Sequence, residues 1–409
     1  MQSDLQRIVD AIAAHVGRPA LIEDRHQRVV AYSEHTGVID EVRRTAILRR
    51  RTLPEVAARL RHLGIRDARG PVRIPACPEL DLLPRVCVPI RHHDLLLGFV
   101  WFLDPDGTLP DSDLGVTGLL EELTLTLYRE NLLGELAAQR ETEATRILLA
   151  DNAESRERAV RAILDGGMIA GDGPVTALVA YLVTPHGRHP DKLARIALEQ
   201  ALVATRRWLS TREALHMVRH DHGVLLLTGA PDSGHPSPEV VAKHLDDGLL
   251  QAIRRVDSVE QTIVGIGQTH PRLADAVRSY RQALQAARVG VQLPMFGRVI
   301  PWSGLGVYRV LSRLDARHLD LHGVHPGLER LIRDQTNLVL LETLERYLDL
   351  AGNAHATAQQ LRLHRATLYY RLRRIEELAE TDLKDGNERL CLHLTLKLAR
   401  LTGHYRPEG

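Results

Sequence analysis

The stretch at residues 353–379 constrains the fold most strongly, because it combines two helical patterns with a short turn between them. Residues 356–361 fit a short helix, residues 362–364 fit the turn, and a second helix follows directly. Ala358 supplies the small side chain that is needed where the two helices touch, whereas Arg362 stands in the turn where glycine is frequent. The pattern predicts a helix-turn-helix whose small core consists of Leu361, Leu363 and Leu368.

The second helix separates into two faces when its residues are placed at about 100° per residue. The face that we expect to be buried carries Leu368, Leu372, Ile375 and Ala379. The opposite face carries Ala366, Tyr370 and Arg373, flanked by Thr367 and Arg374. In a DNA-binding helix-turn-helix, the second helix lies in the major groove with its first residues near base edges. The outer face is therefore predicted to contact DNA, because Arg and Thr side chains bind bases or phosphates.

Charge supports this prediction. The whole chain has a formal net charge of only +1, so a nucleic-acid surface must be a local patch. Between Asp349 and Glu376 there is no acidic residue, although the chain contains 52 of them, and this window holds five arginines and two histidines. The alternative is an arginine-rich helix face that only contacts water. The residues predicted to contact DNA are Thr357, His364, Arg365, Ala366, Thr367, Tyr370, Arg371, Arg373 and Arg374.

Residues 1–110 alternate strand patterns with helical ones, which predicts a compact α+β domain. Helical patterns occupy residues 5–16 and 40–66, and the strands are expected at residues 19–23, 29–32, 86–90 and 95–103. Pro105 and Gly107 mark its end. Residues 111–168 then form a linker of one or two long helices, in which leucines recur at helical spacing. This linker either packs on its own domain or forms a dimerising coiled segment.

Residues 169–300 show the order β-α-β-β-α-β, which predicts a ferredoxin-like, split βαβ domain. Its hairpin surrounds His220, Asp221 and His222. Residues 301–334 are a mixed connector, and residues 335–409 form an all-α domain around the helix-turn-helix. Apolar stripes on the flanking helices should pack on it: Leu338, Leu341, Leu344 and Leu348 before, and Leu390, Leu394, Leu398 and Leu401 after. The fold class is therefore multidomain α+β.

Composition excludes several classes of protein. The three cysteines are isolated and form no CxxC pair, so a zinc finger or a disulfide framework is not expected. The first residues lack the charge and apolar run of a signal peptide. The longest apolar stretch, residues 95–103, is about half of what a membrane-spanning helix needs. The 21 histidines are scattered, so no metal site is predicted. We expect a cytoplasmic protein without membrane contact.

The C-terminal motif resembles the helix-turn-helix of PucR/CdaR-type regulators. The likeness rests on residues 341–348, then Asn353, then Thr357-Ala358, then the run His364-Arg365-Ala366-Thr367-Leu368-Tyr369-Tyr370-Arg371-Leu372. The middle domain resembles the diguanylate-cyclase-like domain of that family, through Val264-Gly265-Ile266-Gly267 and the alanine-rich helix that follows. The N-terminal domain resembles a GAF-type sensor. The resemblance implies a ligand-responsive transcription factor that acts as a homodimer or larger homo-oligomer.

The middle domain is expected to be catalytically silent. Cyclases of that type need a hairpin with a glycine pair and two acids, together with a metal-binding acid on the first strand. Here the hairpin reads His220-Asp221-His222-Gly223, and the first strand at residues 176–184 contains no acid. The sequence therefore predicts no catalytic residue, no cofactor and no metal. The alternative function is that of a nucleotide-binding or nucleotide-cyclising signalling protein built on this domain.

A pocket between sheet and helices in the GAF-like domain could hold a small-molecule effector. The arginines at residues 49–51 could bind an anion there, or they form a solvated helix face. We predict a DNA-binding transcriptional regulator that is gated by an effector or a partner at this domain. The sequence names neither the effector nor the operator, nor does it separate activator from repressor.

Overall fold

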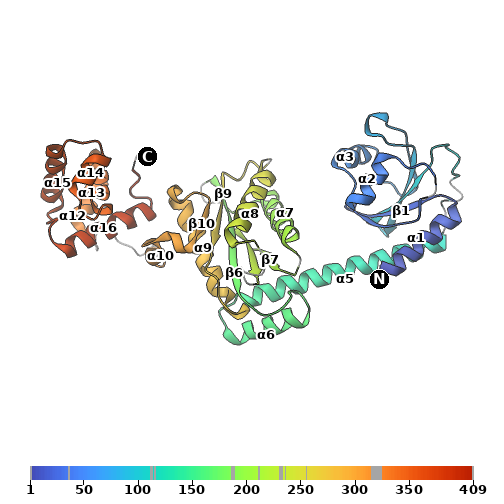
Figure 1. The fold of residues 1–409 in the computed structure, drawn as a ribbon, viewed down its shortest axis with the longest axis horizontal. Coiled ribbons are helices and arrows are strands. Elements are labelled where there is room, and N and C mark those ends of the chain that lie inside the picture. Colours follow the sequence, from blue (N-terminus) through green and yellow to red (C-terminus); the bar gives the residue numbers. More distant parts are fainter. Residues whose placement is uncertain are drawn as a thin grey trace. The chain divides into compact units, whose positions relative to one another are not determined.

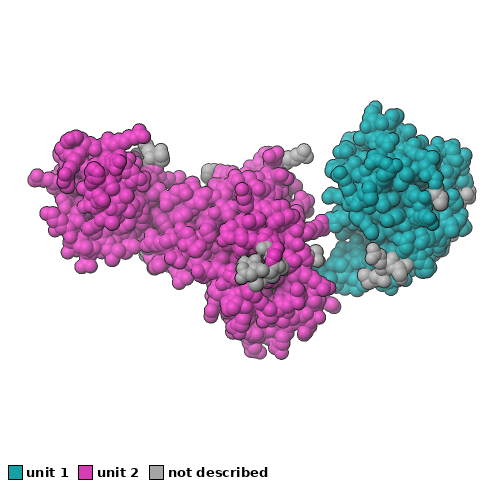
Figure 2. Space-filling view, in the orientation of Figure 1, with its two compact units in different colours: residues 1–139 teal, residues 140–409 magenta. Residues whose placement is uncertain are grey.

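The computed structural model describes residues 2–407 except 36, 111–113, 115–116, 186–188, 211, 230–233, 235, 255 and 315–324. The chain divides into two compact units, residues 1–139 and residues 140–409, each of which is described by itself (Figure 2). Figure 1 shows the fold and labels most of the helices and some of the strands. None of the helices that the structure describes is long and apolar enough to cross a membrane.

Unit 1 is built on a five-stranded antiparallel sheet of order β2-β1-β5-β4-β3. Its strands are β1 (Ala20–Asp24), β2 (Val29–Tyr32), β3 (Val72–Ile74), β4 (Arg85–His92) and β5 (Leu95–Leu103). Successive residues of β5 point to opposite faces, as in any strand. Val100 and Phe102 join the core that contains α1 (Gln2–Val16) and the first part of α5 (Thr117–Leu148). Phe99 and Trp101 join the core that contains α2 (Glu41–Arg49) and α3 (Pro54–His62).

The predicted linker contains two helices, α5 and α6 (Ala153–Asp165), and α6 begins where the Asn152 side chain accepts a hydrogen bond from the Ser155 amide. Leu123 and Leu127 of α5 are buried in the core of unit 1. Farther along α5, Leu132, Leu133 and Leu136 are exposed. The first part of α5 therefore packs on its own domain, and the stretch at residues 132–136 leaves three leucines exposed.

The middle part of unit 2 has a five-stranded sheet of order β10-β9-β6-β8-β7. In chain order the elements are β6 (Val175–Val183), α7 (Lys192–Leu209), β7 (Ala214–Val218), β8 (His222–Thr228), α8 (Pro238–Ile253), β9 (Gln261–Ile266), α9 (Ala276–Gln292) and β10 (Val299–Pro301). The first six elements follow the predicted β-α-β-β-α-β order. Helices α7 and α8 cover one face of the sheet, and α6 and α9 cover the other.

Two glycines, one in β9 and one directly after it, explain the alanine-rich helix beside this strand. A Cβ atom at Gly265 would lie 2.0 Å from the Ala283 carbonyl oxygen, and one at Gly267 would lie 2.1 Å from that of Ser279. The backbones of β9 and α9 therefore approach more closely than any side chain on these two positions would permit. The small residues on α9 bury completely against the strand.

The C-terminal part of unit 2 is a bundle of helices: α12 (Pro326–Arg333), α13 (Leu338–Asp349), α14 (Ala354–Gln360), α15 (Arg365–Ala379) and α16 (Gly386–Leu401). Helix α12 falls in the predicted connector and packs against α15, since a Cβ atom at Gly327 would lie 1.9 Å from the Ala379 carbonyl oxygen. The apolar stripe predicted on α13 is confirmed, with Leu341, Leu344 and Leu348 buried.

The stripe predicted on α16 is wrong at Leu390, which is 58% exposed. Of the other three predicted leucines, Leu398 is buried, and Leu394 and Leu401 are half-buried against the same core. The buried residues of the helix are Leu392, Thr395, Leu396, Lys397, Leu398 and Ala399. The reason is that leucines occur at alternate positions from Leu390 to Leu398, so the sequence offers more than one apolar face. The face that is buried is the one that carries Leu392 and Leu396.

Candidate nucleic-acid interface

A turn stabilised by backbone hydrogen bonds connects helices α14 and α15. The Asn353 side chain accepts from the Ala356 amide (3.0 Å) and so begins α14. At the other end, the Leu363 amide donates to the Ala358 carbonyl (2.8 Å), and Arg362 adopts a positive φ of 53°. Ala358 is buried between the helices, as its small size predicts. The turn therefore places a non-glycine residue in the left-handed region, at the position where glycine is frequent.

Replacing Arg362 by glycine is expected to stabilise this turn. The left-handed conformation costs a non-glycine residue about 1 kcal/mol, which glycine does not incur. Protection of the α14 and α15 amides against hydrogen exchange should therefore rise by about fivefold in Arg362→Gly. Arg362→Ala removes the same charge without relieving the backbone and is the matched control. If alanine stabilised the protein as much as glycine, the effect would arise from charge and not from the backbone.

Thr357 does not lie at the surface. Its side chain is fully buried, and its hydroxyl donates to the Asn353 carbonyl (2.7 Å), so the hydroxyl is used inside α14. The prediction that this side chain contacts DNA is wrong on that geometry. The residues of α14 that do face outward are His355, Gln359 and Gln360.

Helix α15 begins at His364, whose Nδ1 atom accepts from the Ala366 amide at 3.3 Å. The buried face is the predicted one, made of Leu368, Leu372, Ile375 and Ala379. The outer face consists of exposed residues: His364, Arg365, Ala366, Thr367, Tyr369, Tyr370, Arg373 and Arg374. We call this set the outer face of α15. It brings together seven of the nine predicted residues, and it adds Tyr369.

Tyr369 was absent from the predicted set, yet it pairs with Arg365. The guanidinium carbon of Arg365 lies 5.4 Å from the centre of the Tyr369 ring, and Arg365 Nη2 donates to the Tyr369 hydroxyl at 3.3 Å. This pair could have been predicted from the sequence, because residues four positions apart in a helix lie side by side on one face. Arg371 has a different environment. It is half-buried, and its Nη1 donates to Thr343 Oγ1 of α13 at 3.1 Å.

Arg373 and Arg374 share one acidic neighbour. Arg373 Nε lies 3.4 Å from Glu377 Oε1, and Arg374 Nη1 lies 3.3 Å from Glu377 Oε2. All three side chains are about half exposed or more, so these ion pairs are weak and can be exchanged for phosphate contacts. The outer face of α15 thus presents cations that are free to rearrange on an anionic surface.

Comparison with known proteins agrees with this geometry. The model of the PucR C-terminal helix-turn-helix domain matches residues 340–398, and a GGDEF-like domain model matches residues 152–289. The chain is 25% identical to the DNA-binding transcriptional activator AdeR of Bacillus subtilis (strain 168), over 97% of this chain and 93% of that protein. It is 23% identical to the proline-responsive transcriptional activator PutR of the same organism, over 97% of each chain. The chain is a DNA-binding transcriptional regulator that carries a PucR-type helix-turn-helix domain.

A third relative matches a shorter segment of the chain. The purine catabolism regulatory protein of Bacillus subtilis (strain 168) is 39% identical over 69 residues, which are 17% of this chain and 13% of that protein. The helix-turn-helix at residues 340–398 is the part that matches a DNA-binding domain, and DNA is its partner.

The Glu377 carboxylate is predicted to weaken DNA binding by this PucR-type domain. It lies beside the two arginines on the outer face of α15, where it competes with phosphates and repels them. We expect Glu377→Gln to bind duplex DNA about two- to fivefold more tightly, which fluorescence anisotropy at fixed salt can measure. Glu380→Gln makes the same change of charge at the end of α15, beside Arg330, and is the control. Equal tightening in both variants would assign the effect to net charge alone.

The PucR-type domain rests on a buried ionic network between α13 and α16. Glu345 is 5% exposed, and its Oε1 accepts from Lys397 Nζ (3.0 Å) and Arg400 Nη1 (2.9 Å). Lys397 also contacts Asp349, which accepts from His393 Nε2 at 2.8 Å. Burial raises the pKa of Asp349, but the hydrogen bonds from His393 and Lys397 outweigh it and hold that pKa at about 2. This network fixes α13, against which α15 packs.

In the GGDEF-like domain the structure keeps the hairpin but not the acids of a cyclase. Strands β7 and β8 pair in antiparallel register, and Asp221 lies at their turn. Strand β6 contains no acidic residue. Within the described ranges, no cluster of three or more His, Cys, Asp or Glu side chains could hold a metal ion. Asp221 instead accepts a hydrogen bond from the neighbouring His222 ring.

Proposed function

We propose that this transcriptional regulator reads duplex DNA with the outer face of α15. The observation that carries the proposal is the exposed row formed by Thr367, Tyr370, Arg373 and Arg374 on the side of α15 opposite its buried leucines. Small and hydrogen-bonding residues come first along the helix, where base edges are reached, and arginines follow, where phosphates or guanines are reached. Arg371 would act indirectly, by holding α15 to α13 through Thr343.

The regulator is further proposed to act as a homo-oligomer. Leu132, Leu133 and Leu136 are exposed on one stretch of α5, and an exposed apolar helix surface of this kind suits a second copy of the same helix. A dimer would place two copies of α15 on successive major grooves, so the bound DNA should contain two related half-sites.

Selection of bound sequences from random DNA duplexes tests both proposals together. The full chain should enrich a site with two half-sites whose centres lie about one helical turn, or a multiple of it, apart. The Arg373→Ala/Arg374→Ala variant should enrich no common sequence. If the variant selected the same site as the original chain, the outer face of α15 would not be the reading surface.

We also propose that unit 1 is a GAF-like sensor through which an effector or partner controls DNA binding. A small cavity of about 10 Å³ lies between the central sheet and the helices α2 and α3. The charged residues Glu23, Arg43 and Arg85 line it. Glu23 accepts from Trp101 Nε1 (2.9 Å) and from Thr52, and Arg43 donates to the carbonyls of Trp101 (3.3 Å) and Pro19 (3.1 Å). Burial raises the pKa of Glu23 and lowers that of Arg43 to about 9.

Buried charged groups with shifted pKa values are frequent at functional sites, so we propose that an effector acts here. A ligand larger than one water molecule would have to displace a side chain, and this displacement is how a signal could be passed on. One relative is named proline-responsive, which supports a small-molecule effector. Purified protein should then change its affinity for the selected DNA when an effector is added, and Arg43→Met should abolish that response.

The alternative, a nucleotide-cyclising enzyme, is less well supported. The hairpin of the GGDEF-like domain lacks the glycine pair and the second acid, and β6 supplies no metal ligand. We propose that the protein is not an enzyme and acts in the cytoplasm, where its DNA partner is found. Incubation with GTP and Mg²⁺ followed by product analysis should yield no cyclic dinucleotide, and any such product would contradict the proposal.

A further inference from the structure

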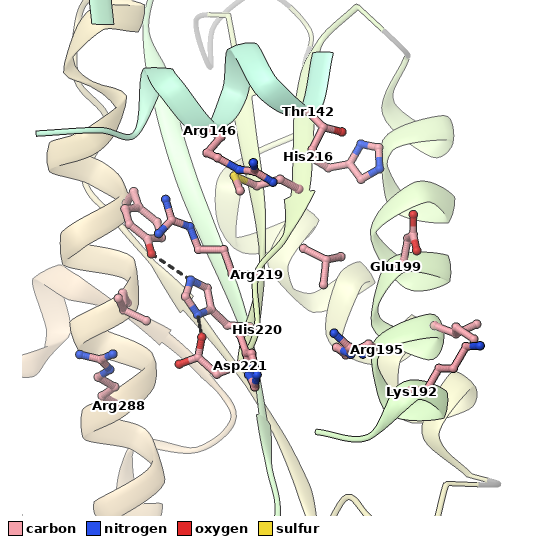
Figure 3. A pocket seen from close by; sticks show the side chains of 16 residues that line it. Thr142, Arg146, Lys192, Arg195, Glu199, His216, Arg219, His220, Asp221 and Arg288 are labelled. Carbon is pink, nitrogen blue, oxygen red and sulfur yellow. Dashed lines mark hydrogen bonds and ion pairs between the residues drawn. The ribbon is translucent and has the colours of Figure 1, made fainter. Parts of the chain in front are cut away.

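A large open pocket lies at the edge of the GGDEF-like sheet, on the β7–β8 hairpin (Figure 3). Its volume is about 1050 Å³, which is at the upper end of the range for small-molecule sites. Three helices form its walls, each through residues spaced three or four positions apart. Thr142 and Arg146 come from α5, residues 192–199 from α7, and residues 280–288 from α9. Residues 216–222 of the hairpin form its floor.

The lining is strongly cationic. It contains five arginine or lysine side chains and two carboxylates, which is a formal charge of +3 with histidines neutral, in a chain whose whole net charge is +1. Figure 3 shows that the cations come from different walls, with Arg195 on α7 and Arg288 on α9 on either side of the hairpin. Charges gathered in a concave site focus the field and attract anions.

Most of these cations have no acidic partner. In the part of the chain that the structure describes, Lys192, Arg195, Arg219 and Arg288 form no ion pair, whereas Arg146 pairs with Glu143 at 3.1 Å. The Nε atom of Arg219 is buried and has no hydrogen-bond partner among the described residues. An acceptor on a bound anion would satisfy this donor.

The floor of the pocket is rigid and ready to position a ligand. His222 is buried, and its ring lies between those of Tyr181 and Tyr280. His222 Nε2 lies 2.9 Å from the Tyr280 hydroxyl, and its Nδ1 lies 2.7 Å from Asp221 Oδ1. The Arg219 guanidinium is placed over the Tyr280 ring, 5.1 Å from its centre. The Asp221 carboxylate is hydrogen-bonded to His222 and does not pair with Arg219. The Arg219 guanidinium therefore lines the pocket in an orientation that the Tyr280 ring fixes.

The pocket also offers apolar surface. Ile196, Met217, Val218 and Leu284 line it between the charged side chains. A site that held only an inorganic ion would need neither this volume nor these apolar groups. A metabolite with an organic body and anionic groups would use both, since apolar contacts supply affinity and the cations fix its orientation.

We infer that this pocket binds a small organic anion that carries phosphate or carboxylate groups. The side chains of Arg195, Arg219 and Arg288 would make its main contacts. The site is distinct from the buried cluster of unit 1, and its anion-binding does not depend on the proposed function of α15. A bound anion would contact α5 directly, because Thr142 and Arg146 belong to that helix.

Isothermal titration of the full chain with two probes tests the inference, namely pyrophosphate for phosphate chemistry and citrate for carboxylate chemistry. At least one should bind the original protein at concentrations below about 10 mM, and the stronger probe identifies the chemistry. Arg195→Ala/Arg288→Ala should weaken binding by about 100-fold, roughly tenfold for each charged hydrogen-bond donor removed. The matched control is Arg158→Ala/Arg161→Ala, which removes two exposed arginines from α6 outside the pocket.

The outcomes separate clearly. Binding that is lost in the pocket variant and kept in the α6 variant supports the site. Binding of neither probe to the original protein overturns it, as does equal binding to the pocket variant or equal loss in both variants. Affinity for the selected DNA duplex should be the same in all three proteins, so a failure here is distinguishable from a failure of the DNA-reading proposal.

Discussion

Replacing Arg373 and Arg374 together by alanine is expected to weaken duplex DNA binding by about 100-fold, because each removed guanidinium is a charged hydrogen-bond donor. Both side chains project from the outer face of α15, and neither contributes to its buried side. The stability of the fold should therefore be unchanged. If the arginines contact phosphate, the slope of log affinity against log salt should also fall by about one for each lost contact.

The experiment is a fluorescence anisotropy titration at several salt concentrations, with the α6 variant Arg158→Ala/Arg161→Ala as the charge-matched control. The control removes two exposed arginines from a different surface and should bind DNA like the original chain. An affinity of the α15 variant within about twofold of the original would contradict the assignment of the DNA face. A changed affinity with an unchanged salt slope would indicate base contacts instead of phosphate contacts.

Replacing Glu345 by alanine is expected to destabilise the helical bundle by about 3–5 kcal/mol, because it leaves buried cations without their partner. Lys397 and Arg400 both donate to the lost carboxylate, and both are largely buried. Since unfolding of a chain with several domains is not a single transition, hydrogen exchange of the α13 and α16 amides is the suitable measurement. Their protection should fall by about 100-fold or more.

A second variant separates the ionic network from simple packing. Glu345→Leu/Lys397→Leu removes both the buried carboxylate and the buried ammonium and replaces them by apolar groups, so it should recover most of the lost protection. Unchanged protection of α13 and α16 in Glu345→Ala would show that the network contributes nothing. Protection of amides in unit 1 should not change in either variant.

The buried side of α15 could be predicted residue by residue. Its apolar residues, Leu368, Leu372, Ile375 and Ala379, recur at one helical spacing, and no competing stripe exists on that helix. Strand β5 was also predicted with the bounds that the structure has, residues 95–103. The signal in β5 is a continuous apolar run, which is buried on both faces, and in α15 it is the helical spacing of the apolar residues. Both signals are local in the sequence.

Other features depended on contacts that periodicity does not encode. The hydroxyl of Thr357 is taken up inside its own helix, and Arg371 turns to Thr343 on α13, which is distant in sequence. Helix α16 carries leucine at alternate positions, so only the packing of α13 decides which of them are buried. The motif pattern was therefore sufficient to locate the helix-turn-helix, but not to assign each side chain to its surface or its interior.

The pocket of the GGDEF-like domain lay beyond sequence reasoning altogether. Its cations come from residues 146, 192, 195, 219 and 288, and only the packing of three helices around one sheet edge places them together. None of these residues belongs to a sequence motif, and from the sequence each one would be interpreted as a solvent-exposed surface charge. The concentration of positive charge is a property of the tertiary structure.

Genome-wide mapping of bound DNA in the organism of origin tests most directly whether the chain is a sequence-specific regulator that reads DNA through α15. The original protein should occupy a limited number of discrete sites that share one sequence and lie near gene starts. The Arg373→Ala/Arg374→Ala variant, expressed at the same level, should lose that occupancy. Uniform occupancy by the original protein, or identical discrete sites for the variant, would contradict the account.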